Sequence, residues 1–553
     1  MSSADMVLHS GKICTVDRHF RFCEAVAVKD GWIIDVGRNT DIKSHIGYHT
    51  QVIDLGGKLT LPGIQDGHTH AAFAGLYWRE DFIDTYRMST ASQVLAALKS
   101  AAEKTGPGEW ILGGGLHRTI YEGRPLDCRH LDTVTPDNPV MLFVNGLHCV
   151  LLNSKGKACC GLDRDTSAPE PENSFIERDD ADEPTGFLAE YEALARVGRR
   201  GYLCTPVELE TCILRSQHIL NRYGITSHND IVGPGGDYLF CGAWGRRVLE
   251  AYASLLQAGK LTARCAINVL TGLNGAQSYE AIIGGLDQLE LPEFTDRTRL
   301  QAKAVKVFGD KDWHRPQEAK TGRFGSCTFP GATEKEQIEN YTSTIVELHR
   351  RGWQIGVHMT GGKGVDVAIA AFLEAQRLYP GKNLRHFLIH GDELNETNVL
   401  DCVRNGIMLQ GQAIAPYGFM EELVEALSTQ QSHEMFDYNS YLKAGMVVAQ
   451  GSDAPSMSAN WLLGLQFMLT RTTQRGNAFR PDLICGIEDG IRMYTINGAY
   501  QNHMEDISGS IEKNKLADFA VLAEDIFHLP PHQIGQTPIA MTICGGKVVY
   551  QSQ

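Results

Sequence analysis

Long apolar runs are absent from this chain. None approaches the roughly 18 residues that a membrane-spanning helix needs. Residues 1–14, MSSADMVLHSGKIC, also lack the basic start and apolar core of a secretion signal. We therefore expect a cytoplasmic protein that has no membrane partner.

Paired cysteines are also missing. The 14 cysteines are scattered singly, apart from Cys159 and Cys160, and no CxxC spacing occurs. This pattern argues against a disulfide framework, and it fits reduced thiols in a cytosolic enzyme.

The chain has fewer basic than acidic residues. It contains 51 Lys and Arg and 66 Asp and Glu, which gives a net charge of −15. A nucleic-acid partner or an anionic membrane is therefore disfavoured. The glycine groups GGGL, GPGGD and TGGKG match neither a phosphate-binding loop nor a dinucleotide fingerprint. The expected partner is a small-molecule substrate, and homo-oligomerisation is left open.

The two ends of the chain are rich in short apolar runs of the β type. Residues 6–37 contain MVLHSGKICTV and AVAVKDGWIIDVG, and the C-terminal segment contains DFAVLAED and AMTICGGKVVYQ, with turn signals between the runs. We predict one small β-sandwich built from residues 1–58 and 505–553.

The middle of the chain alternates short apolar runs with helical stretches, which is typical of a parallel sheet with crossover helices. One such helix is marked by a capping box that starts at Thr333 and by a stop at Gly352. Eight runs predict an α/β fold, a (β/α)8 barrel of the TIM type within residues 59–504. They are Leu59–Ile64, Ile225–Asn229, Arg264–Val269, Ala304–Phe308, Gln354–His358, His386–His390, Ile407–Gln410 and Val447–Gln450.

The first two predicted strands are separated by far more than the roughly 30 residues of a standard unit. The intervening residues 71–224 contain strand-like runs of their own at 110–116 and 140–145, and an acidic, proline-rich piece at 167–186. We predict a large insertion over the mouth of the barrel that serves as a lid or a substrate-shaping module.

Two histidines, His68 and His70, flank Thr69 at the end of an apolar run. In a strand, residues i and i+2 point to the same face, so both rings can be aimed at one metal ion. A bare pair of this kind is also compatible with two unrelated histidines at a strand end. The other strand ends therefore decide between these interpretations.

Candidate ligands follow four further predicted strands in chain order. They are Lys306, His358, His390 and Asp453. Catalytic residues of such barrels lie at the carboxyl ends of the strands, so all six side chains are expected on one rim. Imidazole and carboxylate ligands predict one or two divalent ions, with Zn²⁺ favoured over other transition metals.

The predicted ligands suggest a hydrolytic chemistry. A bound divalent ion lowers the pKa of its water to about 7. Asp453 can then act as general base, accepting a proton and handing it to the leaving group. Lys306 differs from the others because an ammonium group cannot ligate a metal. Pairing with Asp310 or Asp312 in the barrel interior is one interpretation of that lysine.

Several motifs resemble the amidohydrolase superfamily, specifically its large-insert branch, which includes N-substituted formamide deformylases. These motifs are PGIQDGHTH, GITSHND, NSFIERDDADEPTGFL, the strand-end residues and GSIEKNKLADF. The resemblance implies the barrel, the terminal sandwich and a carboxylated Lys306 that bridges two metals. Two segments depart from the family pattern, KVFGD at 306–310 and MTGG at 359–362, and both bear on the identity of the substrate.

Within the insertion, His148 in NGLHCVLLNS resembles a branch motif near the substrate. Either it reaches into the barrel mouth as a substrate-binding residue, or it is a buried structural histidine.

The function expected from these observations is hydrolysis of a C–N bond in a small non-peptide amide, N-acyl compound or cyclic amide. A metal-assisted deaminase, isomerase or C–O hydrolase on the same scaffold is the alternative. A non-catalytic barrel acting as an assembly protein is disfavoured because such relatives usually lose ligands, whereas all six are present here.

Overall fold

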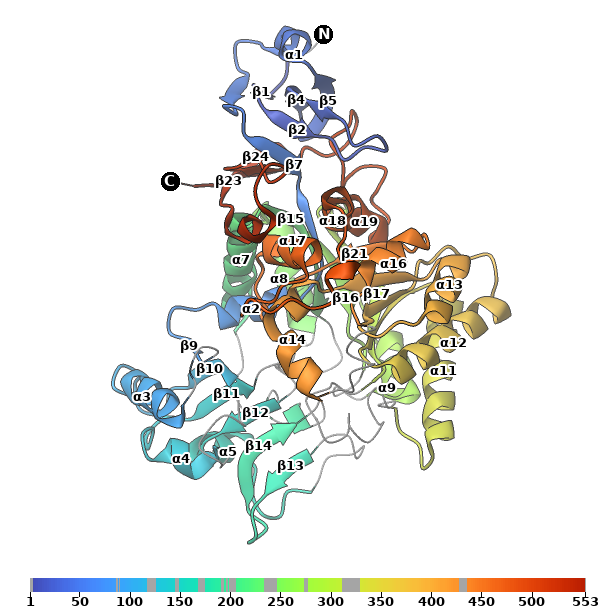
Figure 1. The fold of residues 1–553 in the computed structure, drawn as a ribbon. Helices are drawn as coiled ribbons and strands as arrows, with labels where there is room; N and C mark the ends of the chain where they lie inside the picture. Colours follow the sequence, from blue (N-terminus) through green and yellow to red (C-terminus); the bar gives the residue numbers. More distant parts are fainter. Residues whose placement is uncertain are drawn as a thin grey trace.

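The structure of the protein, a computed structural model, describes most of the chain. The described residues are 3–85, 88, 90–116, 126–144, 149–167, 175–189, 193–194, 197, 205–232, 246–272, 277–310, 329–426 and 435–552. Figure 1 shows two β-sheets built from the termini at one end of the molecule, a barrel in the middle and a further sheet at the opposite end.

The central element is an eight-stranded parallel sheet in the order β8-β15-β16-β17-β18-β19-β20-β21. The strand bounds are β8 Ile64–Thr69, β15 Ile225–Val232, β16 Arg264–Val269, β17 Leu300–Phe308, β18 Gln354–Met359, β19 Phe387–His390, β20 Met408–Gly411 and β21 Val448–Gln450. The predicted TIM-type barrel is thereby confirmed.

The last strand approaches the first through the segment that follows it. The amide of Asp453 donates to the carbonyl of His68 at 2.8 Å, and the amide of His70 donates to the carbonyl of Ala454 at 2.8 Å. Gly451 permits this approach, because a Cβ there would lie 2.5 Å from the backbone nitrogen of His68. The ends of β8 and β21 are thus held together at the point where two predicted ligands leave the sheet.

Helices cover the outside of the barrel (Figure 1). They include α7 Pro206–Arg222, α8 Arg246–Gln257, α9 Tyr279–Asp287, α11 Glu334–Arg350, α12 Gly362–Leu378, α13 Glu396–Asn405, α14 Ile414–Ala426, α16 Tyr438–Lys443, α17 Trp461–Thr470, α18 Ile487–Met493 and α19 Ile496–Gln501. Helix α11 begins with the predicted capping box, in which the Thr333 hydroxyl accepts from the amide of Glu336 at 3.2 Å. Tyr341, Ile345 and Leu348 of its apolar stripe are buried.

The two termini form two facing sheets, in the orders β5-β4-β1-β6 and β24-β23-β22-β7-β2-β3. Their strands are β1 Met6–His9, β2 Lys12–Cys14, β3 Phe22–Cys23, β4 Ala25–Lys29, β5 Trp32–Gly37, β6 Gln51–Asp54, β7 Leu59–Pro62, β22 Phe519–Leu522, β23 Ile539–Cys544 and β24 Lys547–Gln551. Leu8 and Val26 of the first sheet share one apolar core with Ile13 and Phe519 of the second. The predicted sandwich built from both ends is therefore observed.

The predicted first barrel strand, Leu59–Ile64, is wrong. Strand β7, Leu59–Pro62, pairs with β2 and β22 in the terminal sheet, and the barrel strand β8 begins only at Ile64. The chain turns at Gly63, where a Cβ would lie 2.0 Å from the Thr226 hydroxyl. Apolar residues continue from Leu61 to Ile64 across Gly63, so hydrophobicity gives no sign of this break.

The predicted insertion contains a separate six-stranded sheet in the order β13-β14-β12-β11-β10-β9. Its strands are β9 Ile83–Asp84, β10 Ile111–Leu116, β11 Val140–Val144, β12 Cys149–Leu152, β13 Phe175–Arg178 and β14 Pro184–Ala189, with helices α3 Ala91–Ala102, α4 Cys128–Asp132 and α5 Ser154–Cys160. Strands β10 and β11 confirm the runs predicted at 110–116 and 140–145. Helices α2 Ala71–Tyr77 and α7 pack on each other and on β15, so they accompany the barrel.

The carboxyl ends of the barrel strands face away from the terminal sandwich. Strand β8 starts at Ile64, directly after the terminal sandwich, and ends at Thr69, and the chain then continues through α2 toward the six-stranded sheet (Figure 1). The rim that carries the predicted ligands therefore lies on the same side of the barrel as that sheet.

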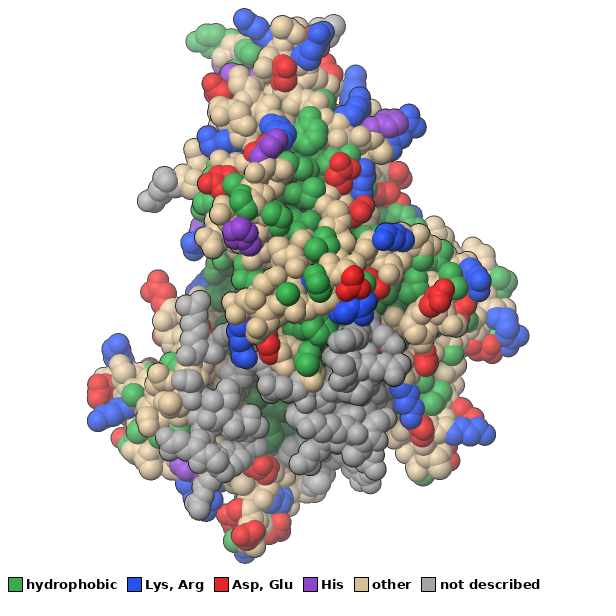
Figure 2. Space-filling view, viewed as in Figure 1, with side chains coloured by type: hydrophobic (Ala, Val, Ile, Leu, Met, Phe, Trp, Pro, Cys, Tyr) green, Lys and Arg blue, Asp and Glu red, His purple; other side chains and the backbone are tan. Residues whose placement is uncertain are grey.

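Figure 2 shows acidic and basic side chains interspersed over the coloured part of this face, while apolar side chains gather between the terminal sheets and the barrel. Among the helices of the described residues, none combines the length and the apolar character needed to cross a bilayer.

Candidate metal centre

The structure brings the four predicted histidines together at one rim of the barrel. His68 lies in β8 and His70 directly after it, while His358 lies in β18 and His390 ends β19. Ring centroids are 5.3 Å apart for His68 and His70, 5.6 Å for His68 and His390, and 4.6 Å for His358 and His390. Four imidazoles from three strands thus form one cluster.

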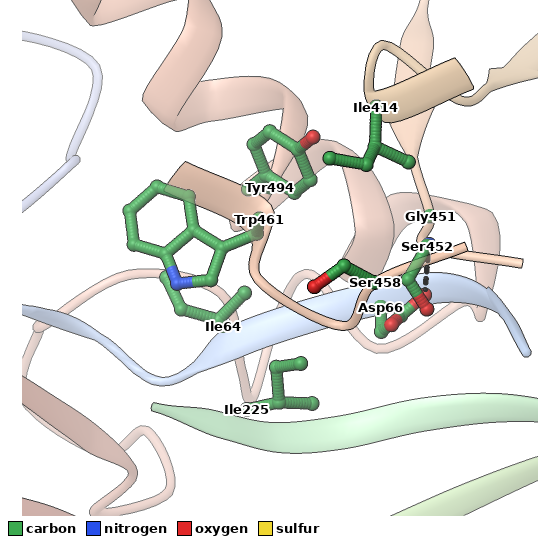
Figure 3. Close-up of a pocket in the computed structure, with 9 residues that line it drawn as sticks. All are labelled: Ile64, Asp66, Ile225, Ile414, Gly451, Ser452, Ser458, Trp461 and Tyr494. Carbon is green, nitrogen blue, oxygen red and sulfur yellow. Dashed lines mark hydrogen bonds between the residues drawn. The ribbon is translucent and has the colours of Figure 1, made fainter. Parts of the chain in front are cut away.

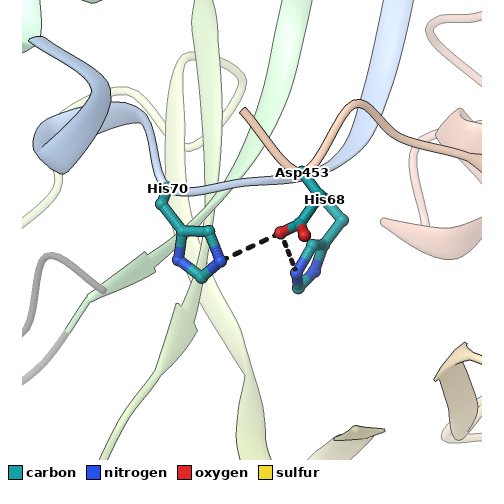
Figure 4. Close-up of side chains that lie close together, drawn as sticks. All are labelled: His68, His70 and Asp453. Carbon is teal, nitrogen blue, oxygen red and sulfur yellow. Dashed lines mark ion pairs between the residues drawn. The ribbon is translucent and has the colours of Figure 1, made fainter. Parts of the chain in front are cut away.

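Asp453 completes the tightest part of this cluster (Figure 4). Its Oδ1 lies 3.2 Å from Nε2 of His68 and 3.0 Å from Nε2 of His70, and the ligand atoms of the three residues lie within 4.8 Å of one another. Among the described residues, neither Oδ1 of Asp453 nor Nδ1 of His68 has a hydrogen-bond partner, although both are buried. Two imidazoles and a carboxylate that converge in this way fit a divalent metal ion such as zinc.

Two of the site residues have left-handed backbones, which is unusual for residues other than glycine. The φ angle is 71° at His390 and 55° at Asp453. Such conformations cost about 1–3 kcal/mol each and concentrate at functional sites. Backbone hydrogen bonds hold them in place, from Gly391 to the carbonyl of Met359 at 2.7 Å and from Asp453 to the carbonyl of His68.

The electrostatics of the cluster favour the protonation states that a metal ion requires. Burial opposes ionisation of Asp453, but the neighbouring imidazoles of His68 and His70 outweigh burial and hold the pKa of this carboxyl well below its usual range. Burial lowers the pKa of His68, and the ammonium group of Lys306 lowers it further. Burial and the adjacent His358 lower the pKa of His390. His68 and His390 are thus kept neutral beside a charged carboxylate.

Lys306 lies within β17 and is buried. Its Nζ is 4.6 Å from the ring centre of Phe308, and its charge acts on both His68 and His390. The lysine therefore lies beside the imidazole cluster, as expected. Asp312, one of its two suggested partners, lies outside the described residues, as does the predicted substrate-binding residue His148.

Asp310, the other suggested partner of Lys306, binds His358. Its Oδ1 lies 2.9 Å from Nδ1 of His358, and its Oδ2 accepts from the amides of Thr360 at 2.8 Å and Gly361 at 3.0 Å. A carboxylate at Nδ1 directs the other ring nitrogen, Nε2, toward a metal ion. Asp310 thus positions a predicted ligand from the neighbouring strand.

Asp66 joins the two segments that carry the cluster. Its Oδ1 accepts from the amide of Ser452 at 2.8 Å and from the amide of His68 at 3.3 Å. Burial raises the pKa of Asp66 to about 7. Figure 3 shows that Asp66 lines a small cavity with Trp461 and Tyr494. The cavity volume of about 10 Å³ is room for about one water molecule.

Comparison with known proteins agrees with this geometry. The model of the amidohydrolase family matches residues 51–550. The chain belongs to the amidohydrolase family.

Two curated relatives of this amidohydrolase match it almost from end to end. The N-substituted formamide deformylase of Arthrobacter pascens is 25% identical, with 99% of this chain and 98% of the relative covered. The protein YtcJ of Bacillus subtilis is 24% identical, with 99% of each chain covered. Among solved structures, an uncharacterized metal-dependent hydrolase from Pyrococcus horikoshii has a TM-score of 0.71 and 18% identity, covering 95% of this chain and 99% of the other.

Sequence reasoning missed three residues that support the ligands of this amidohydrolase. Asp66, two residues before His68, follows the same alternation as His68 and His70, which could have indicated it. Asp310 is named in the sequence analysis only as one possible partner of Lys306, and its contact with His358 is not predicted. Gln412, whose Oε1 lies 2.7 Å from Nδ1 of His390, follows β20 and had no signal of its own.

Proposed function

We propose that this chain is a metal-dependent hydrolase that cleaves a C–N bond in a small non-peptide amide, N-acyl compound or cyclic amide. The convergence of His68, His70 and Asp453 Oδ1 at the carboxyl ends of the barrel strands carries the proposal. Membership in the amidohydrolase family supports hydrolysis, and the choice of a C–N bond follows the similarity to a formamide deformylase.

The three residues would hold one divalent ion, with zinc favoured by the donor set of two imidazoles and one carboxylate. When bound, such an ion supplies Lewis-acid activation of water and of a carbonyl oxygen. Asp453 has a second task as general base. It takes the proton of the attacking water and delivers it to the nitrogen of the departing amine.

His358, His390 and Lys306 are the proposed ligands of a second ion. Addition of CO2 to the Lys306 amine, with release of two protons from the ammonium group to solvent, would convert a cation into a carbamate anion that could serve as an oxygen ligand. Lys306→Ala should abolish activity, and short-chain carboxylic acids should restore part of it. Full activity of this variant would reject the role of Lys306.

The six-stranded sheet on the rim side is the proposed substrate-shaping module, and His148 is its proposed contact with the substrate. The test of the overall function is a hydrolysis screen of metal-loaded protein against formamides, N-acyl amino acids, anilides and cyclic amides. Turnover of at least one of these classes that disappears in Asp453→Asn is expected. Turnover of esters alone, or a metal-loaded protein inert toward all four amide classes, would contradict the proposed reaction.

A further inference from the structure

We infer that Gln410 and Gln412 form a directional hydrogen-bond relay that fixes the ring tautomer of His390, so that its Nε2 is kept as a metal-ligating lone pair. The inference rests on the proposed function for its consequence, metal binding. The tautomer itself is a property of the metal-free chain.

The relay is a continuous series of short contacts. Nδ1 of His390 lies 2.7 Å from Oε1 of Gln412, and Nε2 of Gln412 donates to Oε1 of Gln410 at 2.8 Å. Nε2 of Gln410 in turn donates to the carbonyl oxygen of Gly411 at 3.0 Å. Both glutamines are buried, so water does not compete for these groups.

The direction of the relay follows from its last member. A backbone carbonyl can only accept, so the Gln410 group facing Gly411 is the NH2 group, and its oxygen faces Gln412. Gln412 must therefore present its own NH2 group to Gln410 and its oxygen to His390. An amide oxygen cannot donate, so Nδ1 of His390 carries the proton and Nε2 carries the lone pair.

Close packing keeps Gln410 in this orientation. A Cβ at position 451 would lie 2.7 Å from Nε2 of Gln410, so Gly451 leaves the space that the amide occupies. The same glycine allows β21 to approach His68. One position thus serves both the closure of the barrel and the relay behind His390.

The relay makes His390 a different ligand from His358. His358 has the carboxylate of Asp310 at its Nδ1, whereas His390 has a neutral amide. A carboxylate partner raises the basicity of an imidazole ligand more than an amide does. The contribution of His390 to metal binding therefore depends on tautomer selection rather than on added negative charge.

The direct test is nuclear magnetic resonance of metal-free protein with ¹⁵N-labelled histidine, in which the His390 signals are identified by their loss in His390→Asn. In the wild type the proton should be on Nδ1. Gln412→Met and Gln410→Met should give a mixture of the two tautomers. Gln354→Met is the matched control, because this buried glutamine of β18 donates to the backbone carbonyls of Arg385 and Gln501 rather than to an imidazole.

A proton on Nε2 of His390 in the wild type would overturn the relay, as would relay variants indistinguishable from Gln354→Met. A second readout is metal affinity, measured by competition with a chelator. Loss of such an orienting partner typically costs about 10–100-fold, and Gln412→Met should fall in that range while Gln354→Met stays near the wild type. If the wild type binds no metal but shows the predicted tautomer, the relay stands and the proposed function fails.

Discussion

Histidines occur at both ends of strand β19, and their ring nitrogens are bonded differently. His386, directly before the strand, is buried, and His390, its last residue, is partly buried. At the start, Nε2 of His386 lies 2.7 Å from Nδ1 of His349, and Nδ1 of His386 accepts from the amide of Ile355 at 3.1 Å. The remaining nitrogen of His349 lies 2.9 Å from the carbonyl of Tyr379. Every ring nitrogen of this pair therefore has a partner within the protein.

At the rim the pattern is different. Nδ1 of His390 is bonded to Gln412, whereas among the described residues the buried Nδ1 of His68 has no hydrogen-bond partner. Burying a polar atom without a partner costs about 1–3 kcal/mol. Burial alone therefore does not distinguish a metal ligand from a structural histidine. In His68, a buried ring nitrogen without a partner and a neighbouring carboxylate together indicate a metal ligand.

The largest expected effect is at the rim, in Asp453→Asn. The change keeps the shape of the side chain but removes the base, so kcat should fall about 10²–10⁴-fold. Metal content should fall much less than in His68→Ala, and the thermal midpoint should change little. These quantities are measured on one preparation with a substrate from the screen. A purely structural acid would instead lower the midpoint and leave turnover per folded molecule nearly intact.

A smaller effect is expected from Asp310→Ala, which removes the carboxylate at Nδ1 of His358. Metal affinity should fall about 10–100-fold, because the ring is no longer held with Nε2 toward the ion. Chelator competition measures the change. Asp296→Ala is a suitable control, because this aspartate accepts from Thr298 at the opposite ends of the strands. Equal affinity of the two variants would show that Asp310 does not position His358.

The smallest expected effect concerns the paired histidines at the start of β19. Burial and the neighbouring His349 lower the pKa of His386 to about 3. Between that value and the ordinary histidine pKa, the unfolded chain binds more protons than the folded chain, so stability falls as the pH falls. From pH 7 to pH 5 this residue should cost roughly 2 kcal/mol.

His386→Gln removes the titrating group, so its thermal midpoint should depend less on pH over this range than that of the wild type. The midpoints are compared at pH 7 and pH 5 in the same buffer system. An unchanged pH dependence would mean that the His349–His386 pair accepts a proton in the folded state. The two ends of β19 would then be less different than the hydrogen bonds indicate.

The sequence predicted the site where residue types that can bind a metal follow predicted barrel strands. Lys306, His358 and His390 could be placed on one rim because each lies at the end of an apolar run, and parallel strands end on the same side of a barrel. The pivot at Gly63 was not predicted, because Leu59, Leu61 and Ile64 form one apolar run across it.

Side-chain contacts between neighbouring strands could not be predicted from the sequence either. Asp310 is suggested by the sequence only as one possible partner of Lys306, and its contact with His358 on the neighbouring strand is not predicted. Gln412 contacts His390 because β19 and β20 are neighbours, a register that spacing along the chain does not encode. Alternation predicts which face a side chain takes, and only the folded sheet determines its neighbour.

Metal content of purified protein tests the central claim most directly. Wild-type protein grown in zinc-supplemented medium should contain about one equivalent of zinc or more per chain. His68→Ala should lose most of it, and His386→Gln, altered at the other end of the barrel, should keep the wild-type content. A wild type without bound transition metal, or a His68→Ala variant that binds as much metal as His386→Gln, would contradict the account.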